Sequence, residues 1–309
     1  MVNPVQLSTY AGLTLAVILV SGNNLSACVS TAVGARVINI RKAQLLGGLG
    51  YSLGVALQGK SMTKAVKLLL PTPSGEFILE VFAVTVIIFV LAKVTRVPIS
   101  LTMALVGLLL GASLSNGVSI DRGIMIETVT MWFITPVIAV FTAYTAVRVA
   151  HTHSIKNPWR RLAAMRLTLV VLSFTSSYTL GSNTLGFLVA LTGYTPTTLL
   201  IGVTSAFLGA ITLSSGEIRR VGGELYSLRY TPALVTLLDT TLLVEAATLL
   251  GVPLSNTQAL SSGVFGAALG YRFKYLRIKP YLIIVAGWII TPLLSLALGY
   301  IISTPTHLG

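Results

Sequence analysis

The stretch Val97-Pro98-Ile99-Ser100 recurs 155 residues later as Val252-Pro253-Leu254-Ser255. A second stretch, Trp132-Phe133-Ile134-Thr135-Pro136, recurs 156 residues later as Trp288-Ile289-Ile290-Thr291-Pro292. Two independent matches at nearly one offset indicate an internal duplication, in which each copy is one structural unit. The sequence therefore predicts a protein built from two related halves.

The composition predicts that these halves lie in a membrane. Of the 309 residues, 54% are hydrophobic and 9% are charged, and the mean hydropathy is +0.87. A soluble domain carries about 25% charged residues because its surface faces water. The apolar stretches are long enough for helices that cross a hydrocarbon core of about 30 Å, and the period-two alternation of a membrane β-barrel is not seen. We expect an all-α membrane protein.

Hydrophobic runs bounded by charge, Gly and Pro predict about ten crossings. Two of the runs are long and carry a polar interruption near the middle, at Ser21-Gly22-Asn23-Asn24 and at Gly181-Ser182-Asn183-Thr184. These two interruptions are 160 residues apart, close to the offset of the other repeated segments. Breaks at this depth are tolerated where they line a cavity. The expected crossings are, approximately, 8–35, 43–58, 77–92, 97–116, 126–147, 167–193, 198–214, 231–250, 252–271 and 281–303.

The basic residues predict the orientation. With the N-terminus outside, 17 of the 21 Lys and Arg residues fall in inside loops, as is typical of cytoplasmic loops. The four that remain outside are Lys60, Lys64, Lys67 and Arg122. The expected location is a cell membrane, with several crossings, both termini outside and the basic loops in the cytoplasm.

Five crossings in each half is an odd number, so the second half should be inverted relative to the first. The predicted organisation is a first inverted repeat at 1–150, a basic cytoplasmic linker at 151–166 and a second inverted repeat at 167–309. Inverted repeats with interrupted helices are the architecture of secondary transporters, whose site lies near the midplane at the repeat interface.

The interruptions predict a site for an anion. A half-helix that starts in mid-membrane has free backbone N–H groups and the positive end of its dipole at its N-terminus, and Pro98 and Pro253 suit two further helix starts. The surrounding Ser, Thr, Asn and Gln side chains would give a mostly uncharged, donor-rich lining for a compact oxyanion. The alternative is that small polar residues only let helices pack closely. The predicted substrate-binding residues are Asn23, Asn24, Ser30, Thr31, Ser100, Thr102, Asn183, Thr184, Ser255, Asn256, Thr257 and Gln258.

Four segments together resemble the inorganic phosphate transporter family, the PiT-type permeases. Ser21–Gly34 is similar to the family signature Gly-Ala-Asn-Asp that ends in Gly-Thr-Ser-Val-Gly. Pro253–Gln258 and the following Ser261-Ser262-Gly263 are similar to its Pro-Val-Ser-Thr-Thr-His turn and Ser-Ser-Gly run, and Glu217–Gly222 is similar to one of its basic loops. The resemblance implies cation-coupled uptake of phosphate.

The chain departs from the family at two signature positions. Asn23 and Asn183 match the signature Asn, whereas Asn24 and Thr184 stand where the resemblance implies two Asp. Phosphate at neutral pH still carries a proton and benefits from an acceptor, whereas sulfate needs only donors. The loss of two carboxylates also removes charge that a sodium site would use. A permease for sulfate or another oxyanion is therefore an open alternative.

Acidic residues inside crossings suggest function because they are expensive in a bilayer. Glu80, Asp239 and Glu245 are the candidates to couple transport to a cation, either Na+ or H+. Burial favours the neutral form of a carboxyl group, which suits a proton carrier. The alternative is a structural pair with a neighbouring side chain.

The remaining residues exclude other classes. Cys28 is the single cysteine, so an intrachain disulfide and a thiolate metal cluster are excluded. His151 and His153 lie in the basic linker without further metal ligands nearby, so we expect no metal site there. Trp132 and Trp288 are expected to pack against other helices or to anchor their helices at the membrane interface. The absence of a basic stripe interleaved with aromatic residues argues against nucleic acid as a partner.

The predicted function is secondary active transport of inorganic phosphate by symport with sodium or protons. A passive anion channel on the same scaffold is a second alternative. An enzyme is disfavoured because the sequence has no Cys/His dyad, paired catalytic carboxylates or Walker-type phosphate loop, and no cofactor is expected beyond the coupling cation. The expected partners are inorganic phosphate or sulfate and membrane lipid, and a homodimer is one expected assembly.

Overall fold

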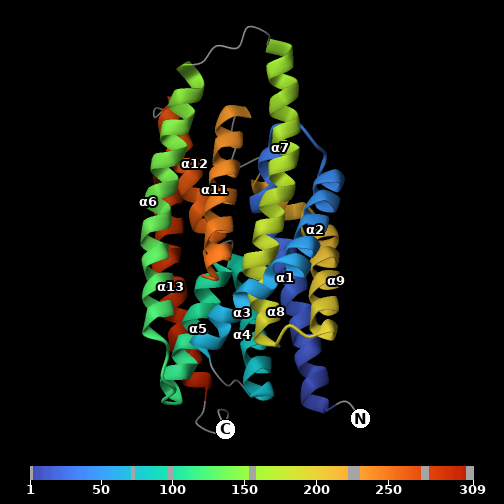
Figure 1. Ribbon diagram of the computed structural model, residues 1–309, viewed down its shortest axis with the longest axis vertical. Coiled ribbons are helices and arrows are strands. Elements are labelled where there is room, and N and C mark those ends of the chain that lie inside the picture. The colour runs from blue at the N-terminus through green and yellow to red at the C-terminus, as the bar shows by residue number, and fades with distance from the viewer. Residues whose placement is uncertain are drawn as a thin grey trace.

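The protein is an all-α bundle. The computed structural model describes residues 3–70, 74–95, 100–152, 158–221, 230–272 and 278–303, and none of these residues is in a strand. Figure 1 shows an elongated bundle in which the beginning of α1 (Pro4–Gly34) and the end of α13 (Ile278–Ile302) lie at the same end. The predicted fold class is confirmed.

The other helices follow in chain order. The first part of the chain contains α2 (Ile40–Leu57), η1 (Gly59–Met62), α3 (Thr63–Leu69), α4 (Gly75–Thr95), α5 (Leu101–Ser115) and α6 (Arg122–Thr152). The second part contains α7 (Pro158–Leu180), η2 (Gly181–Leu185), α8 (Gly186–Leu191), α9 (Pro196–Leu213), α10 (Ser215–Arg220), α11 (Tyr230–Leu250) and α12 (Asn256–Arg272). Because α7 begins at Pro158, the second part of the predicted linker is helical.

Six helices of the described ranges are long and apolar enough to cross a membrane, which makes this a multi-pass membrane protein. They are Pro4–Gly34, Arg122–Ala150, Trp159–Leu191, Pro196–Leu213, Tyr230–Leu250 and Tyr281–Ile302. Helix α5 has 15 residues and is about 22 Å long, so it is too short for the full crossing predicted at 97–116.

Two helix pairs each occupy one half of the bundle's length. In Figure 1, α4 and α5 lie in the lower half, whereas α11 and α12 lie mostly in the upper half. Helix α4 packs against α1 and α5 against α13, while α11 packs against α7 and α12. The inner ends of both pairs therefore meet in the middle of the protein.

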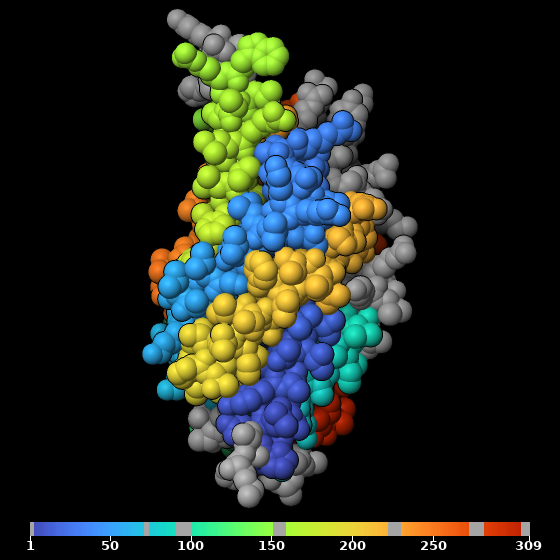
Figure 2. All heavy atoms as spheres, turned by 90° about the vertical axis from the view of Figure 1, so that its right-hand side faces the viewer, coloured from blue at the N-terminus to red at the C-terminus, as the bar shows by residue number. Residues whose placement is uncertain are grey.

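The two halves of the chain are interlocked. Helix α5 of the first half packs along α13 of the second, and α12 of the second half packs along α6 of the first. Helix α9 also crosses over α1 and α2, as the diagonal band in Figure 2 shows. The two predicted repeats are consequently not separate packing units.

Glycines allow the two long interfaces to close. A Cβ at Gly111 of α5 would lie 2.0 Å from the carbonyl oxygen of Leu296, and a Cβ at Gly266 of α12 would lie 2.2 Å from that of Val140. Gly111 and Gly266 are 155 residues apart, and Val140 and Leu296 are 156 residues apart. The same close contact thus occurs twice, at the offset of the sequence repeat.

The predicted break in the first helix is wrong. Helix α1 continues without interruption through Ser21-Gly22-Asn23-Asn24. Gly22 is a packing residue, since a Cβ there would lie 2.5 Å from the Cβ of Leu213 in α9. The second interruption is the π-helical segment η2, where a Cβ at Gly181 would lie 2.5 Å from the carbonyl oxygen of Tyr51. Close helix packing therefore explains the small residues at both positions.

Candidate substrate-binding site

The beginnings of α5 and α12 face each other through two serine hydroxyls. Ser100 Oγ donates to Ser255 Oγ across 2.8 Å, and both side chains are buried. Each serine also caps its own helix, because Met103 N donates to Ser100 Oγ and Gln258 N donates to Ser255 Oγ. The positive ends of two helix dipoles thus meet at one buried point, which is an arrangement that attracts an anion.

The α12 side of this meeting point is rich in polar groups. The Thr257 hydroxyl lies 3.1 Å from that of Ser255. Asn256 is 5% exposed, and neither atom of its amide has a hydrogen-bond partner among the described residues. Gln258 Nε2 donates to the carbonyl oxygen of Trp132, while Gln258 Oε1 is buried without a described partner. Such unpaired groups are uncommon in a folded interior, and they indicate a place for a ligand.

The α5 side is apolar at the corresponding positions. At the repeat offset of 155 residues, Leu101 corresponds to Asn256 and Met103 to Gln258, and both are buried. Only Thr102, which is also buried, keeps the polar character of its counterpart. The amide side chains next to the two serine caps therefore all come from α12. Both α5 and α12 nevertheless begin with a serine cap.

Asn183 fixes the turn between α11 and α12. Its Nδ2 donates to Thr248 Oγ1 and to the carbonyl oxygen of Val252, both across 3.1 Å, and its Oδ1 accepts from Leu254 N across 3.1 Å. Asn183 is fully buried, and Thr184 beside it is buried as well. The bond from Leu254 N holds Asn183 one residue away from Ser255, where it positions the cap of α12.

Helix α1, which carries four of the predicted residues, contacts α12. Ala27 clusters with Leu260 and Val264 of α12, so this part of α1 lies against α12. One turn before Ala27, Asn23 Nδ2 donates to Asn24 Oδ1 across 3.2 Å. Because α1 is continuous, these side chains and not free backbone N–H groups are what α1 offers to a ligand.

Further along α1, Ser30 and Thr31 are buried, and their hydroxyls have no hydrogen-bond partner among the described residues. No hydrogen bond among the described residues joins them to the meeting point of α5 and α12.

The three carboxylates occupy separate places. Glu80 lines a small cavity with Leu108 and Ser303, near the outer end of α4. Asp239 Oδ1 accepts from Thr142 Oγ1 across 2.6 Å, and Glu245 Oε1 accepts from Gln58 Nε2 across 2.6 Å. The side chains that meet at the two serine caps are all neutral.

Three side chains and one backbone carbonyl that contact the predicted residues are absent from the sequence-based prediction of the site. The side chains of Gln58 and Thr142 bind the acidic side chains, that of Thr248 binds Asn183, and the carbonyl oxygen of Trp132 accepts from Gln258. A lone Gln at the end of an apolar run is a signal that could have identified Gln58. The Thr residues carry no such signal, because hydroxyls in membrane helices usually bond to their own backbone.

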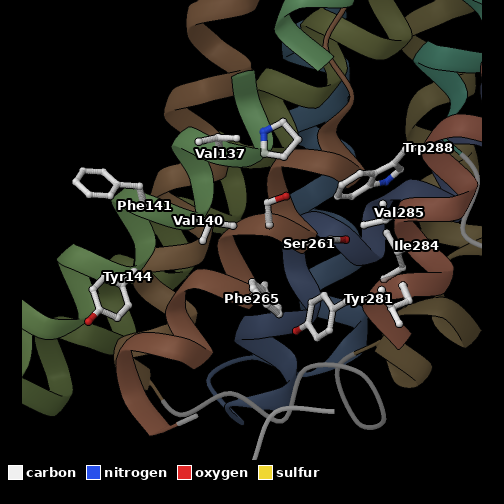
Figure 3. A pocket seen from close by; sticks show the side chains of 13 residues that line it. Val137, Val140, Phe141, Tyr144, Ser261, Phe265, Tyr281, Ile284, Val285 and Trp288 are labelled. Carbon is white, nitrogen blue, oxygen red and sulfur yellow. The ribbon is translucent and has the colours of Figure 1, made fainter. Parts of the chain in front are cut away.

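A larger cavity opens between α6, α12 and α13 (Figure 3). Its volume is about 580 Å³, and its lining includes the rings of Phe141, Tyr144 and Trp288. Phe265 and Tyr281 meet edge to face, with their ring centres 5.0 Å apart. This lining is apolar and cannot replace the water around an oxyanion, so the cavity is not the substrate site.

A protein-family model matches most of the chain. The model of the phosphate transporter family matches residues 20–180 and 151–299. The chain belongs to the phosphate transporter family. This membership confirms the family resemblance that the signature segments indicate.

Relatives of this phosphate transporter family member include archaeal proteins. A protein of Methanocaldococcus jannaschii assigned as a phosphate permease is 24% identical over 285 residues, which cover 92% of each chain. A protein of Pyrococcus abyssi with the same assignment is 34% identical over 109 residues, or 34% of this chain and 26% of its own. A solved structure named as the sodium-dependent phosphate transporter has the same fold, with a TM-score of 0.78, 16% identity and coverage of 97% and 99% of the two chains.

Proposed function

We propose that this protein is a secondary active transporter of inorganic phosphate that uses a sodium or proton gradient and alternating access. The observation that carries the proposal is the buried contact between the helix caps Ser100 and Ser255, beside the unpaired amide of Asn256. Membership of the phosphate transporter family supports phosphate as the substrate.

The chemistry of this point suits a transported anion. Helix N-termini, hydroxyls and an amide stabilise negative charge through donors. The meeting side chains include no Lys or Arg, whose full charge would hold the anion more strongly. Binding of moderate strength allows release on the other side of the membrane. The proposed binding residues are Asn23, Asn24, Ser100, Thr102, Thr184, Ser255, Asn256, Thr257 and Gln258, with Asn183 as a positioning residue, while Ser30 and Thr31 stay predictions.

The repeated contacts support alternating access. The pair Gly111–Leu296 and the pair Gly266–Val140 are equivalent under the sequence offset. A protein with two equivalent hairpins around one site can open either hairpin in turn, by the rocking of related halves that is typical of transporters with inverted repeats. In this proposal the basic loops face the cytoplasm and both termini lie outside.

A sulfate permease of the same family is the second candidate. The observation that favours it is the neutrality of the site, where Asn24 and Thr184 replace two expected Asp residues. A hydrogen phosphate ion has a hydroxyl that needs an acceptor, and sulfate has none. The amide oxygens of Asn256 and Gln258 are the acceptors that this site can offer to phosphate.

Transport by purified protein in liposomes distinguishes these functions. Labelled phosphate and sulfate are supplied separately under an inward sodium gradient, an inward proton gradient or no gradient. We expect saturable phosphate uptake that requires one of the gradients. Uptake of sulfate but not phosphate would replace the first candidate by the second, and ion flow without either gradient would identify a passive channel.

A further inference from the structure

A carboxyl group and a carboxamide face each other where α11 meets the end of α2. Gln58 Nε2 donates to Glu245 Oε1 across 2.6 Å. The other oxygen of each group, Gln58 Oε1 and Glu245 Oε2, is buried and has no hydrogen-bond partner among the described residues. If Glu245 is ionised, both of these atoms are acceptors without a donor, and each such buried atom costs about 1–3 kcal/mol.

One proton satisfies both atoms at once. Bound to Glu245 Oε2, it creates a hydroxyl that can donate to Gln58 Oε1 while the existing bond from Gln58 Nε2 is kept. A carboxylic acid and a primary amide then form a closed pair with two hydrogen bonds. The complementarity of the two unpartnered oxygens is the feature that points to a proton as their ligand.

No other charge in the neighbourhood replaces this proton. Arg220–Glu217 is the ion pair of the described ranges, and Glu245 is not part of it. Tyr178 of α7 interacts electrostatically with the Glu245 carboxylate. Lys64 of α3 lies near the end of α11, where its side chain would contact a Cβ at Gly251. Further ionisable groups on these elements are Arg41, Lys42 and Tyr51 of α2, Lys60 of η1, Lys67 of α3 and Arg160, Arg161 and Arg166 of α7, and within the described ranges none of them forms an ion pair with Glu245.

The second carboxylate of α11 lacks such a partner. Asp239 Oδ1 accepts from Thr142 Oγ1, and Asp239 Oδ2 is buried without a described partner. The Thr142 hydroxyl has one proton and is also near the carbonyl oxygen of Ile138, at 2.7 Å. A protonated Asp239 could donate one hydrogen bond to Thr142 Oγ1 while that hydroxyl donates to Ile138, whereas the carboxyl group of Glu245 and the amide of Gln58 can form two hydrogen bonds.

We propose that Glu245, paired with Gln58, is the binding site of the proton that drives transport, which rests on the proposed function. The site is connected to the substrate by bonded side chains. Thr248 lies one turn beyond Glu245 on α11 and accepts from Asn183, which holds Leu254 N next to Ser255. Protonation keeps α11 against Gln58 and η1, and with them the turn that carries the α12 cap.

Loss of the proton has the opposite effect. It leaves a negative charge on a half-buried carboxyl group whose second oxygen is buried beside the amide of Gln58, where an uncompensated charge is unfavourable. The pair then separates, and the turn between α11 and α12 loses its support on Gln58 and η1. Proton binding and the closed position of this hairpin are thus linked, and the linkage is reciprocal.

The test uses purified wild-type protein, Glu245→Gln and, as a matched control on the same helix, Asp239→Asn. We expect Glu245→Gln to exchange phosphate across liposomes without net driving force, which shows that it is folded, but to lose about tenfold or more of the accumulation driven by a proton gradient. Asp239→Asn should keep that accumulation. Infrared spectra should show a protonated carboxyl band that disappears in Glu245→Gln and shifts in Gln58→Leu.

The outcomes separate this inference from the function on which it rests. If neither a sodium nor a proton gradient makes the wild-type protein accumulate phosphate, the proposed function fails, while the infrared comparison still tests protonation of Glu245. If the wild-type protein accumulates phosphate only under a sodium gradient, or if Glu245→Gln keeps proton-driven accumulation, the inference is overturned. It is also overturned if the carboxyl band disappears in Asp239→Asn instead.

Discussion

The hydroxyl of Ser100 donates to the hydroxyl of Ser255, and the two residues occupy the same position in the two copies of the sequence repeat. A residue that bonds to its own counterpart lies next to the axis that relates the copies. The substrate site proposed here therefore lies on that axis, where a movement of either copy changes its surroundings.

Asn256 is expected to bind the substrate and, when no substrate is bound, to lower the free energy of unfolding of the protein. Asn256→Leu gives the α12 turn the residue found at the equivalent position, Leu101. It should lower phosphate uptake by about tenfold and raise the free energy of unfolding by about 1–3 kcal/mol, because it removes two buried and unpaired polar atoms. Uptake assays and thermal unfolding in detergent measure the two effects. The control Leu101→Met should change both only slightly, and a destabilised Asn256→Leu protein would contradict the ligand role of this amide.

Asn183 is expected to be a positioning residue. Asn183→Ala removes three hydrogen bonds to the turn between α11 and α12 and should destabilise the protein by about 3 kcal/mol. Asn23→Ala removes one bond, to Asn24, and should cost about 1 kcal/mol. Thermal unfolding of the two variants under the same conditions gives the comparison. Equal losses of stability would show that the bonds of Asn183 do not hold the turn.

The two missing carboxylates are expected to determine ion dependence and selectivity. Asn24→Asp combined with Thr184→Asp restores the residues that the family signature has at these positions. The added carboxylates should increase the dependence of phosphate uptake on sodium and weaken inhibition by sulfate, since hard cations and hydrogen phosphate both use carboxylate oxygen. Uptake at varied sodium and sulfate concentrations checks this. An unchanged response to both ions would show that these positions do not control selectivity.

The close approach of α5 to α13 and of α12 to α6 is expected to require glycine. Gly111→Ala and Gly266→Ala place a methyl group 2.0 Å and 2.2 Å from a backbone oxygen of the facing helix, which should cost about 1–3 kcal/mol each. Gly216→Ala is the control, because no atom lies within 4 Å of a Cβ there. Thermal unfolding of the purified variants measures the difference. If Gly111→Ala is as stable as the wild-type protein, α5 and α13 can move apart without a loss of stability, and the prediction is wrong.

The sequence was sufficient to predict the helical class, the positions of most helices and the starts of α5 and α12, because hydrophobic length and Pro-Xaa-Ser segments are local signals. It was not sufficient to explain Gly22 and Gly181. The same glycine signals a helix break or a close neighbour, and only the position of Leu213 or Tyr51 across the interface decides between them. The pairing of Gln58 with Glu245 could not be predicted from the sequence either, because 187 residues separate them.

The contact of α5 with α13 has a consequence for biosynthesis. Helix α5 belongs to the first half of the chain, whereas its principal neighbour, α13, is synthesised after all the other described helices. Throughout translation, the newly inserted first half has an open side that lipid or the insertion machinery must cover. A protein truncated before α13 would expose this side permanently, and cellular quality control should then degrade it.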